Sequence, residues 1–597
     1  MTGASAKAQS EKTGDRAWLH EAIMIASVLG MTLAAYLGTL RYGFVYDDDA
    51  QIVANSYIQY WRHIPLYFIS HVWAFKVPQA GVGNYYRPIF MVWLRLNDVW
   101  FGIHPAGWHA TAIALHLVAT FLVYVVARKL AKRISVAGFT ALIFGLHPMH
   151  AEAVAWISGA TESLCAIFIL AGFWAYLKSR EGNGAMWMTL SCLLYAFAVF
   201  SKETGAVLPL LVFAYSWIYW EGAAESQNTM QRLWACVRSV LAYVPVALFY
   251  LLARGLVLHG MGHTLVQLKL REVIFSVPSM LGFYVKKWFL PYRLNEFYDM
   301  PYWSTLNFWH VIMPAIVVIA LLLVIWMARI ALGVREVKFA LFWIIVPLLP
   351  VLDASVLPRD ELVHERYFYL PSFGAALLVG LALDRWTRSP RGGKVFGFPV
   401  AQIAVGLLLA AGLGTLAARE SQIWYSDFTL YQRGYALAPH NTNARTDFGA
   451  ELVKRGDFND ARVVLKKILA DDPTDTTARL NLSRIDYMEH NYAESERWLN
   501  EAIALNKYDA DLYTSLALTD LRLNRAGDAL SNMREAAALR PNDPTILYAY
   551  GVVLELNGNC ALASDQFRSL LAIRPGEGYV EMQLNHCQQV LSRTSRN

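Results

Sequence analysis

Three consecutive aspartates, Asp47, Asp48 and Asp49, follow closely on the first long apolar segment of the chain, residues 22–40. A helix needs about 20 apolar residues to cross a bilayer, so this segment is long enough to span one. The aspartates then lie where hydrocarbon meets water, within reach of the head group of a membrane-dissolved substrate. A carboxylate at that depth can take the proton of an acceptor hydroxyl, so all three are catalytic candidates.

Other charged residues stand at the ends of later apolar runs, in the segments YYRP (85–88), HPAGWH (104–109), HPMHAE (147–152), SKETG (201–205) and 353–372. Charged groups so close to hydrocarbon are costly and tend to mark functional sites. The cations that could hold a phosphate are Arg87, Lys202 and Arg366. The remaining candidate site residues are His104, His147, His150, Glu152, Glu162, Glu203 and Glu365.

A base and phosphate-holding cations are the two requirements for moving a sugar from a polyprenyl phosphate to a hydroxyl group. The departing lipid phosphate carries less charge than a nucleotide diphosphate, so a metal ion is not obligatory. The five cysteines show no metal-ligand spacing. We therefore expect no cofactor and no dedicated metal site, although the acidic triplet could bind Mg²⁺ or Ca²⁺ weakly.

Each candidate also has a purely structural interpretation. The aspartates could cap a following helix, and His147 and His150 could be satisfied by the backbone. Lys202 could extend from the end of an apolar run to water, and Arg366 could form a structural ion pair with Glu365. The catalytic hypothesis depends on all of these segments facing one side of the membrane.

The composition excludes a soluble globular protein, because 56% of the 597 residues are hydrophobic and the mean hydropathy is +0.32. Lysines and arginines occur in short clusters beside apolar runs, which indicates membrane topology rather than nucleic-acid binding. We expect residues 1–20 to form a cytoplasmic tail, held there by Lys7, Lys12 and Arg16. The segment 22–40 is then a signal anchor rather than a cleaved leader.

Apolar runs predict an all-α bundle of about eleven spans within a membrane domain at 21–420, whose first external loop is 41–107. The predicted spans are 22–40, 109–127, 134–148, 153–177, 186–200, 205–220, 240–258, 308–328, 338–352, 368–386 and 397–417. An odd number places the two termini on opposite sides, and the basic clusters agree with that arrangement. The additional apolar stretch 273–290 is expected to be re-entrant or interfacial.

The region 421–597 has a different periodicity. Pro439, Pro473, Pro541 and Pro575 all fall on one 34-residue grid, and small residues recur on the same grid. This period predicts a solenoid of tetratricopeptide repeats with a C-terminal cap, on the side of the acidic triplet. Cys560 and Cys587 could form a disulfide there or remain two buried thiols.

The order of the motifs resembles the transmembrane and tetratricopeptide repeat-containing O-mannosyltransferases of the GT-C glycosyltransferase superfamily, in a bacterial-type form. The motifs that carry the resemblance are FVYDDD (44–49), YYRP, HPAGWH, HPMHAEAVAWISGATE (147–162), SKETG and ERYFYLPS (365–372), followed by the repeats. The resemblance implies a GT-C fold, a polyprenyl- or dolichyl-phosphate sugar as donor, inversion at the anomeric carbon, and a protein Ser or Thr hydroxyl as acceptor.

By position, Asp47 and Asp48 match the Asp-Asp pair of that family, one of which would be the base, and Asp49 extends the pair. Glu152 and Glu162 match acidic positions of the family. Where relatives often have Gly-Arg, this chain has Gly159-Ala160, which removes one phosphate-binding arginine.

These observations predict an integral-membrane glycosyltransferase that moves a hexose such as mannose, with the repeats recruiting the acceptor. Alternatives are transfer to a lipid or cell-envelope glycan, a transporter of lipid-linked sugars, and a non-catalytic membrane scaffold. The expected partners are the lipid-linked sugar, the acceptor and membrane lipids, but no nucleic acid. The short loops favour a bacterial inner membrane with periplasmic repeats, while an extracellular or endoplasmic-reticulum location stays open.

Overall fold

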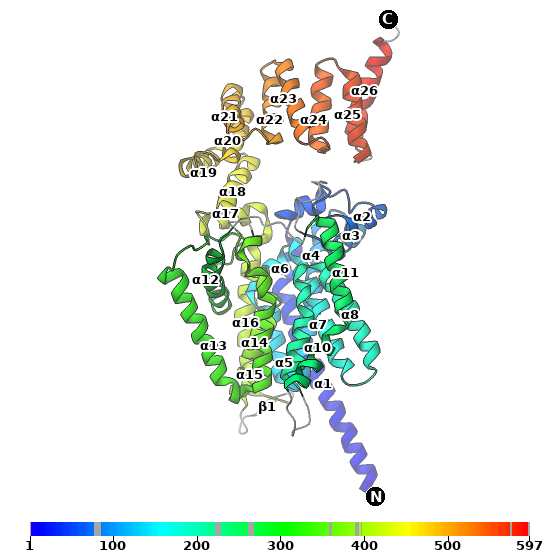
Figure 1. Ribbon diagram of the computed structural model, residues 1–597, viewed down its shortest axis with the longest axis vertical. Helices are drawn as coiled ribbons and strands as arrows, with labels where there is room; N and C mark the ends of the chain where they lie inside the picture. Colours follow the sequence, from blue (N-terminus) through cyan, green and yellow to red (C-terminus); the bar gives the residue numbers. More distant parts are fainter. Residues whose placement is uncertain are drawn as a thin grey trace. The chain divides into compact units, whose positions relative to one another are not determined.

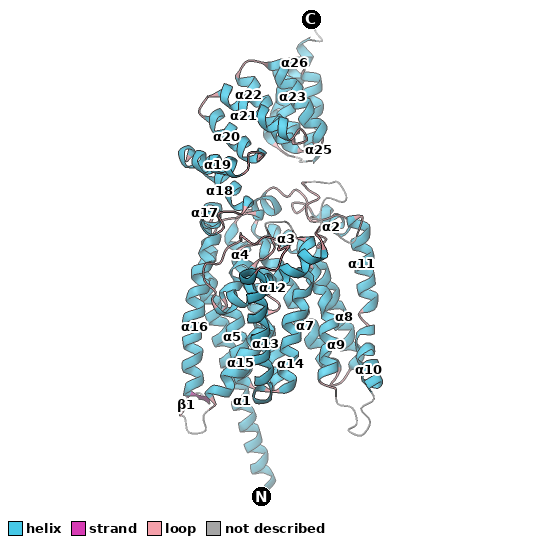
Figure 2. Ribbon diagram, turned by 60° about the vertical axis from the view of Figure 1, so that its left-hand side comes forward, coloured by secondary structure: helices cyan, strands magenta, loops and turns pink. Residues whose placement is uncertain are grey.

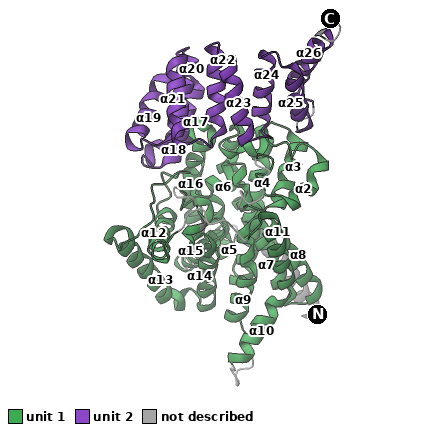
Figure 3. Ribbon diagram, turned by 45° about the horizontal axis from the view of Figure 1, so that its top comes forward, with its two compact units in different colours: residues 1–430 green, residues 431–597 purple. Residues whose placement is uncertain are grey.

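The computed structural model describes residues 2–76, 85–220, 229–260, 268–357, 361–388, 393–395, 397–573 and 576–594. The described chain is almost entirely helical, and its β-structure is one hairpin of β1 (Lys394–Val395) and β2 (Phe398–Pro399), paired antiparallel (Figure 2). It divides into two compact units, residues 1–430 and 431–597 (Figure 3). The predicted fold class, an all-α membrane bundle followed by helical repeats, is confirmed.

The described part of the first unit contains seventeen α-helices, of which the longest lie side by side (Figure 1). They are α1 (Thr2–Tyr36), α2 (Ile64–Ile69), α3 (Pro88–Phe101), α4 (Pro105–Ala131), α5 (Ile134–Leu146), α6 (Ala151–Ala155), α7 (Thr161–Ser179), α8 (Gly184–Ser201), α9 (Leu208–Ile218), α10 (Thr229–Leu241), α11 (Val244–Leu258), α12 (Leu270–Phe289), α13 (Met313–Leu332), α14 (Val334–Leu348), α15 (Ser372–Thr387), α16 (Val400–Ser421) and α17 (Asp427–Leu437), the last of which continues into the second unit.

Six of the described helices are long and apolar enough to cross a membrane, or up to eight if each of two bent pairs forms one span. The six are Trp18–Arg41, Pro105–Ala131, Ser158–Ser179, Gly184–Ser201, Phe308–Leu332 and Val400–Tyr425. The bent pairs are Ile134–Leu146 with Pro148–Ala155 and Thr229–Leu241 with Val244–Leu258, each bent by 53°.

This number is smaller than the eleven spans that the apolar runs predict. The predicted spans 205–220, 338–352 and 368–386 coincide with α9, α14 and α15, which have 11, 15 and 16 residues. The apolar runs continue through residues that fold as 3₁₀ turns, at Glu203–Val207 before α9 and at Leu349–Val351 after α14. Even with its 3₁₀ turn, Glu203–Ile218 is a shorter apolar helix, so the predicted number of eleven stays a prediction.

At the centre of the first unit, α15 packs on α5, α5 on α4 and α4 on α7. Most residues of α5, α7 and α15 are buried. Small residues permit this close packing. A Cβ atom at Gly380 of α15 would lie 2.6 Å from Thr140 Oγ1 of α5, so only glycine allows the two helices to approach this closely. The stretch 273–290 folds as α12, which packs against α13, and its interfacial placement stays a prediction.

The chain leaves the first unit beside the acidic triplet. The Gly43 amide donates a hydrogen bond to the Tyr425 carbonyl (3.3 Å), and the Tyr46 amide donates to Asp427 Oδ1 (2.8 Å). The loop that follows α1 and the end of α16 therefore meet at the same end of the bundle.

The second unit consists of paired helices from α18 onward: α18 (Thr442–Arg455), α19 (Phe458–Asp471), α20 (Thr476–Met488), α21 (Tyr492–Leu505), α22 (Ala510–Arg522), α23 (Ala526–Leu539), α24 (Pro544–Leu556), α25 (Cys560–Ile573) and α26 (Gly578–Thr594). The small residues of the 34-residue grid lie where paired helices touch. A Cβ atom at Gly449 would be 2.7 Å from Leu465 Cδ2, and one at Gly551 would be 2.4 Å from Phe567 Cε1. Cys560 and Cys587 are buried free thiols.

Candidate active site

The loop after α1 holds the acidic triplet in a fixed turn. Tyr46 has a positive φ of 62°, an uncommon conformation for a residue other than glycine, and its amide is bound by Asp427. Asp48 is buried and accepts hydrogen bonds from the Ser158 amide (2.9 Å) and hydroxyl (2.6 Å), and from the Val45 amide (3.3 Å). Burial raises the pKa of Asp48 to about 7, although these hydrogen bonds favour its ionised form. Asp48 therefore fastens the loop to the turn that precedes α7.

The two neighbouring aspartates have different surroundings. Asp47 is only partly exposed and, among the described residues, receives one weak hydrogen bond, from Gln51 Nε2 at 3.5 Å. Burial, and then the charge of Glu296, raise its pKa to about 7. A carboxyl group with that pKa is ionised in part at neutral pH and is well suited to act as a general base. Asp49 is exposed.

Beside Asp47, the guanidinium of Arg366 joins two buried glutamates. Its Nη1 donates to Glu296 Oε1 (2.9 Å) and Oε2 (3.0 Å) and to Glu152 Oε1, and its backbone amide donates to Glu152 Oε2 (2.9 Å). The guanidinium also lies 5.2 Å from the ring centroid of Trp156 and 5.3 Å from that of Tyr367. These glutamates raise the pKa of Arg366 despite its burial.

The sequence had suggested a structural pair between Arg366 and Glu365, and the structure does not form it. Glu365 instead accepts hydrogen bonds from the Tyr298 hydroxyl and the Asn295 amide (3.3 Å). Burial, and then the charge of Glu152, raise the pKa of Glu365 to about 8. Glu365 thus positions the loop that carries Glu296.

A second carboxylate holds the same loop. Glu420, near the end of α16, accepts hydrogen bonds from the Arg293 amide (3.3 Å) and the Leu294 amide (3.0 Å). Three consecutive backbone amides, 293–295, therefore bind carboxylates of two other segments. This arrangement places Glu296 opposite Arg366.

The two other predicted cations are also paired. Lys202 is buried and binds Glu162, so it does not reach to water as its structural interpretation supposed. Arg87 binds Glu203 through Nη2 (2.8 Å) and Nε (3.1 Å), and Arg254 Nη1 binds the same carboxylate at 3.2 Å. Burial would raise the pKa of Glu203, but the two guanidinium groups lower it to about 2. Two guanidinium groups therefore share one carboxylate.

These groups come from distant segments and influence one another electrostatically. Arg366 opposes the increase in the pKa of Asp47. The pKa of Lys202 is lowered first by burial, and the charges of Arg87 and Arg366 lower it further. Loop 41–107 and the segments 201–205 and 353–372 are thus close enough to share one electrostatic environment.

The predicted histidines lie outside this group of charges. His147 stacks on Trp288 with 4.0 Å between ring centroids, and its Nε2 is 3.1 Å from the Trp288 carbonyl. His150 Nε2 is 3.0 Å from Ser372 Oγ. His104 is exposed at the start of α4. The structural interpretation therefore fits the backbone contacts of His147, whereas His150 Nε2 contacts a side-chain hydroxyl.

Sequence reasoning missed several residues of the site, among them Glu296, Arg254 and Ser158. Glu296 lies in an irregular polar and aromatic stretch, PYRLNEFYDMPYW (291–303), directly after an apolar run. The other candidate segments were chosen because they hold charged residues beside apolar runs. Glu296 meets the same criterion, so it could have been predicted. Arg254 lies inside a predicted span and Ser158 carries no charge, so neither offered a comparable signal.

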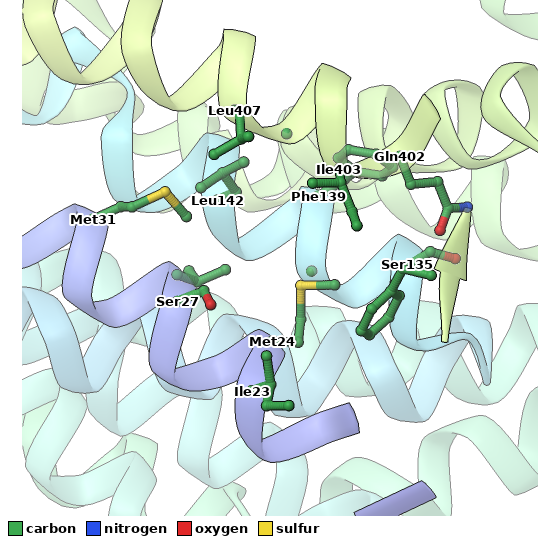
Figure 4. A pocket seen from close by; sticks show the side chains of 14 residues that line it. Ile23, Met24, Ser27, Met31, Ser135, Phe139, Leu142, Gln402, Ile403 and Leu407 are labelled. Carbon is green, nitrogen blue, oxygen red and sulfur yellow. The ribbon is translucent and has the colours of Figure 1, made fainter. Parts of the chain in front are cut away.

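An apolar pocket of about 260 Å³ lies between α1, α5 and α16 (Figure 4). Its lining includes Met24, Phe139 and Leu407, with Ser27, Ser135 and Gln402 as polar members. The lining residues of α16 lie in its first half, remote in sequence from Glu420. The pocket offers no titratable side chain and does not compete with the charged site.

Comparison with known proteins agrees with this arrangement of bundle and repeats. Protein O-mannosyl-transferase TMTC3 of Mus musculus is 24% identical over 567 residues, which is 87% of this chain and 60% of that protein. Protein O-mannosyl-transferase Tmtc1 of Drosophila melanogaster is 33% identical over 191 residues, which is 31% of this chain and 22% of that protein. The chain is similar to the TMTC protein O-mannosyl-transferases. It spans about 60% of the length of the mouse protein.

The repeats are recognised independently. Two tetratricopeptide-repeat family models match residues 452–518 and 514–578, which confirms the predicted repeats. Among solved structures, TTC0263, a thermophilic tetratricopeptide-repeat protein of Thermus thermophilus, is 19% identical and aligns over 31% of this chain and 96% of its own, with a TM-score of 0.25.

Proposed function

We propose that this protein is a GT-C glycosyltransferase that moves a hexose such as mannose from a polyprenyl or dolichyl phosphate to a Ser or Thr hydroxyl of a protein. The observation that carries the proposal is the environment of Asp47. Its carboxylate has few hydrogen-bond partners among the described residues and a pKa near neutrality, and it lies in the electrostatic field of Arg366 at one end of a membrane bundle. The similarity to TMTC protein O-mannosyl-transferases supports the choice of substrates.

In the proposed reaction, Asp47 accepts the proton of the acceptor hydroxyl as its oxygen attacks the anomeric carbon of the sugar. The bond between that carbon and the phosphate oxygen breaks, and its electron pair leaves with the lipid phosphate. Attack from the side opposite the phosphate inverts the anomeric centre. Asp48 keeps Asp47 in position through its hydrogen bonds to Ser158 and Val45.

The departing phosphate requires positive charge at the place where its own charge develops. Arg87 and Arg254 both contact Glu203, so two guanidinium groups lie close together. We assign the donor phosphate to this pair, with Lys202 and Arg366 as the nearest further cations. Arginine suits the task because its fork of donors matches phosphate oxygens.

We further propose that the N-terminus lies in the cytoplasm of a bacterium and that the repeats lie in the periplasm. The basic clusters of the sequence support that orientation. The chain leaves the first unit next to the acidic triplet, which supports a role for the repeats in delivering an acceptor protein to it.

The direct test is an assay of the purified full-length protein in lipid nanodiscs with a polyprenyl-phosphate hexose and protein acceptors, followed by mass spectrometry. We expect hexose on Ser or Thr residues, with the inverted anomeric configuration by NMR. Hexose found only on a glycan or lipid would show the wrong acceptor class. Donor binding without any transfer would favour the scaffold or transporter alternatives.

A further inference from the structure

The structure brings together three potential metal ligands that are far apart in the sequence: Glu152 of α6, Glu296 of the loop after α12, and His364. One ligand atom from each lies within 4.8 Å of the other two. His364 Nδ1 is 3.3 Å from Glu296 Oε1 and 3.9 Å from Glu152 Oε1. Ligands bound to one ion at about 2.0–2.2 Å lie no more than roughly 4.4 Å apart, so small side-chain adjustments suffice.

His364 is fully buried, and neither of its ring nitrogens has a hydrogen-bond partner among the described residues. Leaving buried polar atoms without a partner is costly, and native structures rarely do so without a reason. With the ring proton on Nε2, the Nδ1 lone pair faces two carboxylate oxygens, and a cation between them would satisfy all three groups. His364 is thus an unsatisfied ligand directed at the two glutamates.

Arg366 is an ion-pair partner for Glu152 and Glu296, but it gives His364 no hydrogen-bond partner. Its Nη1 contacts Oε1 of both Glu152 and Glu296, the same oxygens that His364 faces. One guanidinium charge balances only one of the two carboxylates, and Asp47 adds a further negative charge to the surroundings when ionised. A dication would make this group of side chains neutral or positive.

We propose that Glu152, Glu296 and His364 form a binding site for a divalent transition-series cation, Mn²⁺ or Zn²⁺. Two carboxylates with one imidazole suit these ions better than Ca²⁺ or Mg²⁺, which prefer oxygen ligands alone. The ion competes with Arg366 for the same carboxylate oxygens, so its binding releases the guanidinium toward Trp156 and Tyr367. The sequence predicted no metal site because the three ligands share no local spacing.

The test of this site measures the metal directly and needs no assay of sugar transfer. The full-length protein in nanodiscs is stripped with EDTA and titrated with Mn²⁺ under electron paramagnetic resonance. We expect about one tightly bound ion per chain, with a ¹⁴N coupling from one imidazole ligand. His364→Ala should abolish the nitrogen coupling, and Glu296→Gln should weaken binding by more than roughly 100-fold, since even outer-shell partners contribute 10–100-fold.

Two matched variants serve as controls. Glu162→Gln removes another buried, paired carboxylate, and His490→Ala removes an exposed histidine of the second unit; both should keep the ion and its nitrogen signal. Arg366→Met should bind Mn²⁺ more tightly because the competing cation is gone. Absence of stoichiometric Mn²⁺ and Zn²⁺ from the wild-type protein, or binding without nitrogen coupling, would overturn the proposal whether or not the variants fold.

Discussion

The two units of this protein use charged residues in opposite ways. In the first unit, buried ion pairs join residues that are far apart in the chain, such as Arg366 with Glu152 and Lys202 with Glu162. In the second unit, Arg497 pairs with Glu494 and Glu501 on its own helix, and all three side chains are about half exposed. The charges of these buried bundle pairs are therefore costly and tied to tertiary structure, whereas those of the Arg497 pairs are local and solvated.

The largest expected difference concerns stability. Lys202→Met leaves Glu162 buried without its partner and should lower the free energy of unfolding by about 3–5 kcal/mol. The double variant Lys202→Met/Glu162→Met should recover most of that loss, because a buried ion pair can often be replaced by apolar residues of similar size. Thermal unfolding in nanodiscs measures both, and a single variant as stable as the wild type would contradict the buried-pair account.

The next largest loss of stability is expected when Asp48, which binds loop 41–107 to Ser158, is replaced. Asp48→Ala removes the acceptor of three hydrogen bonds and leaves the Ser158 and Val45 amides without a partner, which should cost roughly 2–3 kcal/mol. Proteolysis of loop 41–107 should accelerate accordingly. Asp457→Asn, at an exposed pair with Arg455, is the matched control and should change neither quantity.

A change of pH is expected to have a smaller effect, on both the transfer rate and the stability of the folded protein, through the ionisation of Asp47. Asp47 can act as a base only when ionised, and its pKa is raised from 3.8 to about 7, by burial and by Glu296 and Glu361 against Arg366 and Lys76. Transfer should therefore rise as the pH rises through about 7. The same shift makes the folded protein less stable as the pH rises from about 4 to 7, because the folded state holds the proton more tightly than the unfolded one. A pH–rate profile that is flat between about pH 6 and 8 would contradict the assignment.

The smallest change in stability is expected for a substitution in the repeats. Arg497→Met removes the same kind of charge as Lys202→Met, but from an exposed helix surface, and should change stability by less than about 1 kcal/mol. Thermal unfolding of the two variants under identical conditions compares the units directly. Equal losses in both would remove the distinction between them.

The difference between local contacts in the repeats and long-range contacts in the bundle also explains which features could be predicted from the sequence. The repeats were predictable because their period of 34 residues is local, and each small residue on the grid meets the neighbouring helix. The site residues Asp47, Arg87, Lys202 and Arg366 were identifiable as charges beside apolar runs. Their partners Glu152, Glu162 and Glu203 were candidates too, but the pairing was not predictable. Glu296, for example, reaches Arg366 only through the loop held by Glu420 and Glu365.

Two further features depended on tertiary structure. His147 matched a site motif, yet it stacks on Trp288, which the sequence could not indicate. The number of spans stays a prediction, because apolar composition does not show which of the runs form helices as short as α9, α14 and α15. In both cases composition identified the kind of residue, and packing decided what it does.

The central claim is that Asp47 is the base of a site assembled from distant charged segments. The most direct measurement is the transfer rate of Asp47→Asn with saturating lipid-linked hexose, together with its affinity for the donor. We expect the rate to fall by about 10²–10⁴-fold, the usual contribution of a general base, while donor affinity and thermal stability stay close to those of the wild type. Transfer at the wild-type rate would contradict the claim.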